Sequence, residues 1–369
     1  MFVDRFMRTE LGSLTSIKTG KLDANASSEN GIYPFFTCAV EPLKIDSYSY
    51  DCECVLVAGN GDLNVKYYNG KFDAYQRTYI IESKDKSKLT VPYLYYFLES
   101  YIETLRNQSI GGIIKYIKLG NLTNAPIPVL SIKEQNEIVK TLDKAKSIIT
   151  RIRTQLEKLD LLVKARFVEM FGDPVSNPYN WEKISLGKLA EIKIGPFGSL
   201  LHKEDYVHNN HALINPSHII NSKVFADMKL TVSDEKYEEL RAYQLFTGDV
   251  VMGRRGEMGR CAVITENGLL CGTGSMIIRT NGRLKADYIQ KIISFPSFKK
   301  TIEDMAVGQT MPNLNVPIVS KFMIICPPIE VQEQYYSFIE KTDKSKVAMQ
   351  KELGKAQTLF DSLMQEYFG

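Results

Sequence analysis

Polar and cationic side chains gather in short, glycine-containing loops of this 369-residue chain. Arg254 and Arg255 stand between Gly253 and Gly256, directly after the apolar run 250–252. An arginine on an exposed loop can donate two hydrogen bonds to O6 and N7 of guanine, which is worth about 1–3 kcal/mol of discrimination between bases. The same pattern is also compatible with a pair of solvated loop arginines.

A second set of this kind consists of Tyr75, Gln76 and Arg77, which follow a predicted β-hairpin. Glutamine can bind adenine, arginine can bind guanine, and tyrosine can bind a phosphate. In the alternative interpretation, Tyr75 belongs to the core and only Arg77 is exposed. We predict that this set contacts bases or phosphates.

Other polar loops supply the remaining candidates. Residues 308–315, with the sequence GQTMPNLN, lack strong apolar anchors, and Gly308 permits unusual backbone angles or a close approach to a duplex. An ordinary asparagine-rich turn has the same composition. The further candidates for nucleic-acid contact are Lys115, Tyr116, Lys203, His218, Gln309, Thr310, Asn313 and Asn315.

The chain lacks the local patterns of common catalytic sites. There is no phosphate-binding loop, no nuclease pattern of spaced acidic residues and lysine, and no triad signature. The segment Asn177-Pro178-Tyr179 lacks the second proline of the loop with which amino-methyltransferases hold adenine. The six cysteines form no C-x-x-C pair, so we predict no metal site. The absence of these patterns makes an enzyme that acts alone the least favoured hypothesis.

The composition is that of an ordinary globular protein, with 44% hydrophobic and 24% charged residues. No apolar run approaches the roughly 18 residues that a membrane span needs. The N-terminal residues lack the apolar stretch of a signal peptide, so we predict a cytoplasmic protein. The formal net charge of +3 is small for a protein that binds nucleic acid unaided. Any such role must depend on local patches or on partners.

The chain carries its sequence signals twice. The pattern L-G-x-L-x-x-I-K-x-G, the pattern P-x-(L/I)-x-(I/V)-x-E-Q and a terminal E-(M/Y)-F-G each occur once in either half. Their positions are Leu11–Gly20 and Leu186–Gly195, Pro128–Gln135 and Pro327–Gln334, and the residues ending at Gly172 and Gly369. Two related halves favour a two-part target over a single catalytic pocket.

Each half is predicted to end in a long helix with an apolar seam of heptad spacing. Ser131 and Glu134 match a capping box at the start of the first helix, and Gly172 is a stop signal. Such a seam needs a partner helix, and a two-fold relation of the halves would make the pair antiparallel. The seam residues are Ile138, Leu142, Ile149, Ile152, Leu156 and Leu159 in the first helix, and Phe338, Met349, Leu353, Leu359 and Leu363 in the poorer second seam.

Mixed helical and strand-like segments precede both predicted helices. Asn69-Gly70 is typical of a tight hairpin turn, and Asn267-Gly268 occupies the matching place in the second half. The order of elements repeats, whereas most side chains do not. We predict an α+β protein with two mixed α/β domains and an internal pseudo-two-fold. The predicted boundaries are 1–130 and 173–327 for the domains and 131–172 and 328–369 for the helices.

This order of elements resembles the specificity (S) subunit of type I restriction–modification systems over essentially the whole chain. Further matching pieces are the segments 171–181 (FGDPVSNPYNW), 247–259 (TGDVVMGRRGEMG) and 308–315. The resemblance implies two target-recognition domains, each for one half of a split, asymmetric DNA site. It also implies an antiparallel coiled coil of the two conserved-region helices that fixes the separation of the domains. One departure is Ser109–Asn121, where the first half has SIGGIIKYIKLGN in place of the polar loop of the second half.

The resemblance also implies partners. The family's subunit has no catalysis of its own and docks two methyltransferase (modification) subunits, which recruit endonuclease/translocase (restriction) subunits. S-adenosylmethionine, ATP and Mg²⁺ then belong to these partners, and no membrane is involved. The alternative hypothesis is a coiled-coil scaffold whose mixed domains bind other proteins.

Overall fold

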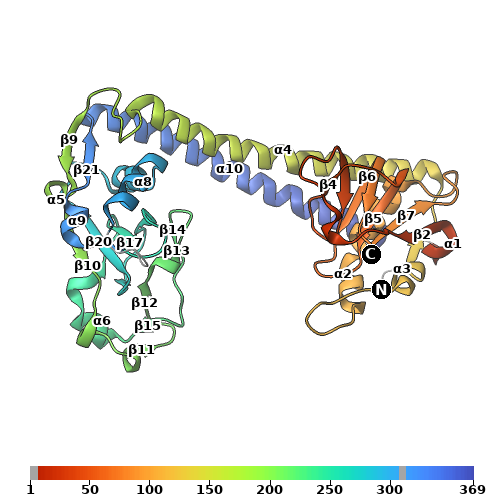
Figure 1. Cartoon of the computed structure of the whole chain (residues 1–369), viewed down its shortest axis with the longest axis horizontal. Helices are drawn as coiled ribbons and strands as arrows, with labels where there is room; N and C mark the ends of the chain where they lie inside the picture. Colours follow the sequence, from red (N-terminus) through yellow and green to blue (C-terminus); the bar gives the residue numbers. More distant parts are fainter. Residues whose placement is uncertain (1–6, 307–312) are drawn as a thin grey trace. The chain divides into compact units, whose positions relative to one another are not determined.

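The chain forms two compact units that both mix helices and strands, which confirms the predicted α+β class (Figure 1). The computed structural model describes residues 7–306 and 313–369. The first unit comprises the residues through Lys158 together with Lys344–Gly369, and the second comprises Leu159–Asp343. Within these described ranges, no helix is long and apolar enough to span a membrane. The predicted four-part division of the chain stays a prediction.

A six-stranded sheet forms the centre of the first unit. Alternate residues of its strands enter two different cores, with Val55 and Val57 on the face covered by helix α2 (Val91–Gln108) and Cys54 and Leu56 on the other. All neighbouring strands are antiparallel except β3 (Tyr33–Phe36) and β6 (Val65–Ala74), which are parallel. In spatial order the strands are β2 (Thr15–Thr19), β7 (Thr78–Ser83), β5 (Tyr50–Ala58), β6 (Val65–Ala74), β3 (Tyr33–Phe36) and β4 (Leu43–Ile45).

Shorter elements complete the first unit. Helix α2 (Val91–Gln108) buries Tyr93, Leu94, Phe97 and Leu98 against the sheet. Strands β1 and β8 form a two-stranded antiparallel ladder, and β8 directly precedes the long helix α4 (Ile132–Phe171). The remaining elements are β1 (Arg8–Glu10), α1 (Leu11–Leu14), the short 3-10 helix η1 (Ala24–Ala26), α3 (Leu119–Thr123) and β8 (Pro126–Pro128).

The second unit contains the counterpart of this sheet and an additional one. Four strands, β10 (Ala190–Ile194), β20 (Ser275–Thr280), β17 (Val250–Gly253) and β18 (Cys261–Val263), form the counterpart. The additional sheet was not predicted, because its strands are too short for a periodic pattern. In spatial order its strands are β11 (Tyr206–Val207), β15 (Thr231–Val232), β12 (His211–Ile214), β19 (Leu269–Cys271) and β16 (Gln244–Leu245).

Helices and small ladders surround the two sheets of the second unit. Strand β9 (Glu182–Ser185) pairs with β21 (Met323–Cys326), and β13 (Ile219–Ile220) pairs with β14 (Lys223–Val224). The α-helices are α5 (Leu186–Leu189), α6 (Asp234–Glu239), α7 (Ala286–Ile293), α8 (Pro296–Met305) and α9 (Val316–Ser320). The short 3-10 helices are η2 (Gly198–Leu200), η3 (Lys203–Asp205), η4 (Pro216–His218) and η5 (Arg241–Tyr243).

Both predicted hairpin turns are wrong. Asn69 and Gly70 lie inside β6, paired with Glu53 and Cys52 of β5, and the β5–β6 connection is the segment 59–64. Gly70 adopts a φ of 138° without ending the strand. Asn267-Gly268 joins β18 to β19, which belong to different sheets. The dipeptide signal was overridden because the long ladder continues through it.

The last glycine of the repeated pattern L-G-x-L-x-x-I-K-x-G has the same packing role in both units. A Cβ on Gly20 would lie 2.1 Å from the carbonyl oxygen of Ala74, and one on Gly195 would lie 2.0 Å from that of Gly272. Both glycines directly follow an edge strand of their sheet, where another backbone lies within contact distance. No side chain fits there, so this glycine is a packing requirement of the repeated fold.

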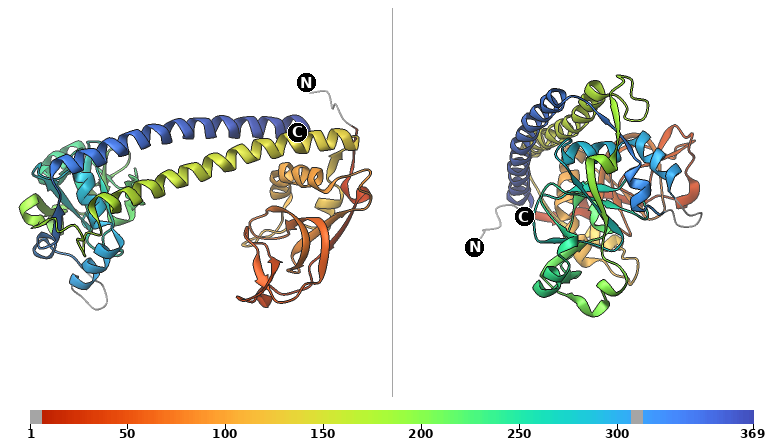
Figure 2. Two further views of the ribbon diagram at one scale, coloured as in Figure 1. Left: turned by 90° about the horizontal axis from the view of Figure 1, so that it is seen from above. Right: turned by 90° about the vertical axis from the view of Figure 1, so that its left-hand side faces the viewer.

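The two long helices are α4 (Ile132–Phe171) and α10 (Ile329–Phe368), drawn in full in Figure 2. Their first residues and their last residues are separated by the same 197 residues of chain. The predicted capping box of α4 is present, because the backbone N–H of Ser131 donates to Glu134 Oε2 (2.9 Å) and that of Glu134 to Ser131 Oγ (3.3 Å).

A buried glutamine marks the same turn of each helix. Gln135 donates its Nε2 to the carbonyl of Leu130 (3.0 Å), and Gln332 donates to that of Pro327 (2.9 Å), in both cases five residues back. The sequence comparison paired Gln135 with Gln334 instead. In the structure Gln135 matches Gln332, which lies two residues before Gln334. The structural equivalence follows the first residues of the two helices and not the E-Q dipeptide.

The core of each unit contains the start of one long helix and the end of the other. In the first unit, Ile138 and Leu142 of α4 pack in the same core as Met364 and Phe368 of α10. In the second unit, Phe167 and Phe171 of α4 pack against Tyr335 of α10, with ring centroids 5.6 and 5.1 Å from Tyr335.

The helix segments within the first unit run antiparallel. Ile138 and Phe368 share a core, and further along α4 Arg153 Nη2 donates to Gln357 Oε1 (3.4 Å). Ile138, Leu142 and Ile149 are buried, as predicted. Seven further predicted seam residues are half-buried: Ile152, Leu156, Leu159, Phe338, Met349, Leu353 and Leu363.

Leu359 is the exception, since 57% of its surface is exposed. Its neighbour Phe360 packs against the first unit's core instead. The predicted seam placed Leu359 three residues after the half-buried Ala356. In the structure the buried stripe of the helix continues four residues after Ala356, at Phe360. In the structural register, Leu359 matches the exposed Leu162, and Phe360 matches the buried Val163.

Two leucines of the long helices provide a matched test of this packing. Leu142→Ala should lower the free energy of unfolding by about 2–5 kcal/mol, because Leu142 is fully buried and its truncation leaves a cavity. Leu359→Ala should change it by less than about 0.5 kcal/mol. Urea unfolding followed by circular dichroism measures both, and equal losses would contradict the assigned faces of the helices.

Candidate nucleic-acid interface

Three loops meet at one edge of the sheet in the first unit. They are residues 59–64 between β5 and β6, residues 75–77 between β6 and β7, and residues 109–118 after α2. Backbone hydrogen bonds join them: Gly59 N–H donates to Arg77 O (2.7 Å), Ile117 N–H to Gly59 O (2.9 Å) and Gly61 N–H to Lys115 O (2.9 Å). We call this place the first loop junction.

The first loop junction brings several predicted residues together. Tyr75, Arg77 and Tyr116 line one open cleft of about 460 Å³, together with Asn60 and Ile114. Asn60 and Ile114 were not predicted, because a single asparagine or isoleucine in a loop gives no sequence signal. The arrangement offers a guanidinium, an amide and two phenol groups within one cleft, which suits hydrogen bonding to base edges or phosphates.

Gln76 and Lys115 lie at the rim of this junction. Gln76 is exposed, but its Nε2 donates to Asp23 Oδ1 (2.8 Å), so a base would have to compete for that amide. Lys115 is exposed, and its backbone oxygen takes part in the bond to Gly61. The backbone of Lys115 is therefore fixed, and its side chain lies at the surface.

An equivalent junction lies in the second unit. Arg254 N–H donates to Gly274 O (3.0 Å), and Leu314 N–H donates to Arg254 O (2.9 Å). These bonds match those of Gly59 and Ile117 in the first unit. An isolated β-bridge also joins Arg255 to Asn313, as another joins Asn60 to Tyr116. We call this place the second loop junction.

The two arginines of the second loop junction have different surroundings. Arg254 is half-buried, and its Nε donates to Asn313 Oδ1 (3.2 Å) and Leu314 O (3.3 Å). Burial, and then the neighbouring charge of Arg255, lower the pKa of the Arg254 guanidinium. Arg255 is exposed. Arg255 thus presents its guanidinium to solvent, while Arg254 also holds Asn313 and Leu314 in place.

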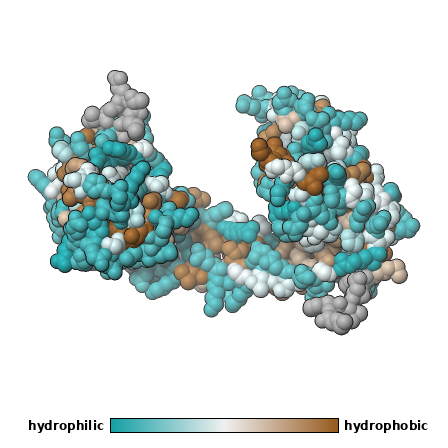
Figure 3. Space-filling model, turned by 90° about the horizontal axis from the view of Figure 1, so that it is seen from below, coloured by the Kyte–Doolittle hydropathy of each residue, from teal (hydrophilic) through white to brown (hydrophobic). Residues whose placement is uncertain are grey.

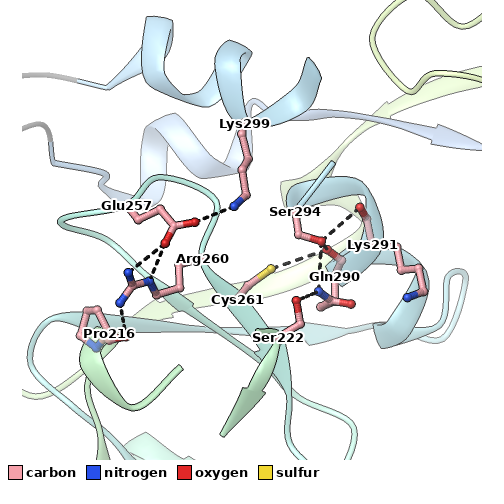
Figure 4. Close-up of polar contacts among 9 residues, drawn as sticks. All are labelled: Pro216, Ser222, Glu257, Arg260, Cys261, Gln290, Lys291, Ser294 and Lys299. Carbon is pink, nitrogen blue, oxygen red and sulfur yellow. Dashed lines mark hydrogen bonds and ion pairs between the residues drawn. The ribbon is translucent and has the colours of Figure 1, made fainter. Parts of the chain in front are cut away.

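A polar cluster braces the loop that carries Arg255 (Figure 4). The Glu257 carboxylate accepts from Arg260 Nη2 (2.8 Å) and from Lys299 Nζ (2.7 Å) of α8, and these two cations hold the pKa of Glu257 below its usual range. Arg260 Nη1 also donates to the Pro216 carbonyl (3.2 Å). The loop is therefore tied to α8 and to η4.

Cys261, the residue after Arg260, connects the end of this loop to helix α7. Cys261 Sγ lies 3.6 Å from the carbonyl oxygen of Gln290 in α7, and Gln290 Nε2 donates to Ser222 Oγ (2.8 Å). Sequence analysis missed Glu257, since its role depends on residues distant in the chain. The brace fixes the backbone from which Arg255 projects.

The other predicted contacts are placed less favourably. His218 is buried, with its Nδ1 2.8 Å from Leu213 O, so the ring serves the fold and is not offered to a duplex. Asn315 caps α9, because its Oδ1 accepts from Ile318 N–H (2.9 Å). Lys203 is exposed in η3, in a segment that supplies none of the contacts given above for the junction. Gln309 and Thr310 lie outside the described residues.

The part of the chain that the structure describes contains no group of three or more His, Cys, Asp or Glu side chains placed to hold a metal ion. The buried thiols of Cys54, Cys261 and Cys271 have raised pKa values, first of all because burial disfavours the thiolate. All three side chains lie in the apolar cores.

Several solved structures share this fold. The S subunit of a type I restriction–modification system from M. genitalium aligns over 100% of this chain and 98% of its own, with a TM-score of 0.59 and 16% identity. A chain from a structural study of complex assembly and conformational transition of the type I R-M system aligns over the same shares, with a TM-score of 0.63 and 14% identity. Both likenesses show the fold.

Curated relatives extend the comparison to sequence. The EcoDI specificity subunit of a type I restriction enzyme from Escherichia coli is 26% identical over 392 residues, which cover 96% of this chain and 85% of the relative. The MjaVIII specificity subunit from Methanocaldococcus jannaschii is 20% identical over 270 residues, which cover 68% of this chain and 63% of the relative.

The family model described as the type I restriction modification DNA specificity domain matches twice, at residues 4–159 and 178–356. The two matches follow the doubling seen in the sheets, the junctions and the long helices. The chain therefore belongs to the family of type I restriction–modification DNA specificity subunits, the proteins that recognise DNA sequence for these systems.

Proposed function

We propose that this chain recognises a bipartite, asymmetric DNA target, with one half-site for each loop junction. The observation that carries the proposal is the pair of equivalent junctions with different side chains. Matching backbone hydrogen bonds hold the loops in both units, whereas Asn60 and Tyr116 in one unit are replaced by Arg255 and Asn313 in the other. One backbone arrangement with two sets of donors and acceptors suits two different base sequences.

The proposal includes partners, because the chain offers little charge for binding DNA alone. Its formal net charge is +3, and phosphate contacts supply much of the affinity of DNA-binding proteins. Docked methyltransferase subunits would share that load and carry out the methylation. The specificity subunit itself is then non-catalytic. S-adenosylmethionine, ATP and Mg²⁺ would bind to the methyltransferase and restriction subunits.

Exposed apolar side chains on the long helices support docking of methyltransferase subunits. The hydropathy view shows hydrophobic residues on the surface of the helical region (Figure 3). The helix segments of both units carry such residues, which suits one partner for each unit. The exposed apolar residues are Ile148, Val347 and Leu359 in the first unit, and Leu161, Leu162, Val168 and Ile329 in the second.

The scaffold alternative is less well supported. It requires the loop junctions to bind proteins, but both junctions present arginine and amide side chains, which can form hydrogen bonds with base edges. Family membership also favours DNA recognition.

Arginine variants test whether each junction serves its own half-site. In the assembled methyltransferase complex, Arg255→Ala should reduce discrimination at one position of one half-site by about 5- to 150-fold, as loss of a bidentate arginine–guanine contact does. Arg77→Ala should affect the other half-site. Methylation rates on duplexes with single base-pair changes measure both effects.

The control for this experiment is Arg241→Ala, since Arg241 is exposed, pairs with Glu238 and lies outside the junction. The control should leave discrimination unchanged. If Arg77→Ala and Arg255→Ala weakened methylation of all duplexes equally, the arginines would bind phosphates without recognising bases.

Glu257→Gln tests the brace beneath Arg255. The depressed pKa of Glu257 means that the carboxylate is charged, and the brace complete, above the usual carboxyl pKa; the brace is lost as pH falls through the depressed value. The variant should therefore lose several-fold of discrimination in the half-site of the second unit at neutral pH. Glu266→Gln, an exposed control, should not. Unchanged discrimination in Glu257→Gln would show that the cluster does not position Arg255.

A further inference from the structure

The loop of residues 109–118 in the first unit ends in an exposed apolar tip. Ile113 is fully exposed and Ile114 is 62% exposed, although isoleucine is among the residues most often buried. No apolar residue of the described chain covers Ile113. A loop tip that served only as a connection would be expected to carry polar residues.

The tip is built and held by backbone contacts. Ile110 N–H donates to Tyr116 O (3.0 Å) and Tyr116 N–H to Ile110 O (2.9 Å), which closes the loop at its base. Gly111 has a φ of 115°, and a Cβ there would lie 2.5 Å from Ile114 O, so the turn into the tip requires glycine. The bond from Gly61 N–H to Lys115 O fixes the tip beside the first loop junction.

The neighbours of the tip indicate what covers it. Ile114 lines the same cleft as Asn60, Arg77 and Tyr116, and Lys115 follows directly along the chain. Cationic, amide and phenol groups around an apolar tip match a surface that presents negative charge, hydrogen-bonding edges and a small apolar group together. A DNA groove does so, because the thymine 5-methyl group is an apolar group on the base edges of the major groove.

We propose that Ile113 and Ile114 contact the methyl group of a thymine in the half-site of the first unit. This inference rests on the proposed function and adds a base-discriminating contact that is apolar. It assigns thymine to at least one position of that half-site. Burial of one methyl group corresponds to about a fourfold change in affinity.

The test removes a single methyl group from the DNA. The complex of this chain with its methyltransferase is titrated with duplexes that carry the methylated target. In each duplex one thymine is replaced by deoxyuridine, which lacks only the methyl group. The wild-type complex should bind one such duplex about fourfold more weakly. The double variant Ile113→Ala/Ile114→Ala should bind this duplex and the thymine duplex equally well, and should keep its discrimination at the other positions.

The control variant is Ile32→Ala, because Ile32 is 77% exposed in the same unit but lies outside the junction. It should keep the wild-type response to deoxyuridine. Urea unfolding of the double variant should match the wild type, since both replaced side chains are exposed.

Three results would overturn the inference. The deoxyuridine effect could persist in the double variant, or no thymine of the target could show it. Alternatively, the double variant could lose binding of the methyltransferase, which would make the tip a protein contact. In all three cases sequence-specific binding by the wild-type complex upholds the proposed function, whereas absence of any sequence-specific binding would remove both.

Discussion

A forty-residue helix with one apolar stripe is stable in water only when that stripe is covered, and the rest of this fold depends on how the two long helices satisfy that requirement. Each compact unit buries the start of one helix and the end of the other in its own core. Ile138 and Leu142 pack with Phe368 in the first unit, and Tyr335 packs with Phe171 in the second. The two helices have the same length and are offset by 197 residues along the chain, which suits this reciprocal packing in two related units.

The loops that we propose to contact DNA are also held in an equivalent way in the two units. Backbone hydrogen bonds hold the loops of both junctions together, so several of the side chains that project from them can differ between the two units. Asn60 and Arg255 occupy equivalent places, as do Tyr116 and Asn313. A scaffold of this kind can change its recognised bases by substitution at the junction while the glycines and the helix seams stay under packing constraint. The brace of Glu257, Arg260 and Lys299 shows that one junction also recruits side chains for rigidity.

Sequence alone predicted the features that depend on local periodicity. The ends of α4, its capping box and the buried positions Ile138, Leu142 and Ile149 follow from heptad spacing and capping chemistry. Features set by tertiary contact were missed. The ladder of β5 and β6 overrides the Asn69-Gly70 turn signal, Phe360 takes the buried place predicted for Leu359, and His218 and Asn315 are used by the fold. Asn60 carries no sequence signal, because only the folded loops bring it beside Arg77 and Tyr116.

We propose that one scaffold, used twice with different side chains, recognises two different half-sites. The decisive measurement is a map of methylated adenines in the genome of cells that contain this chain and its methyltransferase. We expect a split motif with two dissimilar half-sites and an unspecified gap between them. A continuous motif, a palindrome with identical halves, or methylation without sequence dependence would contradict it.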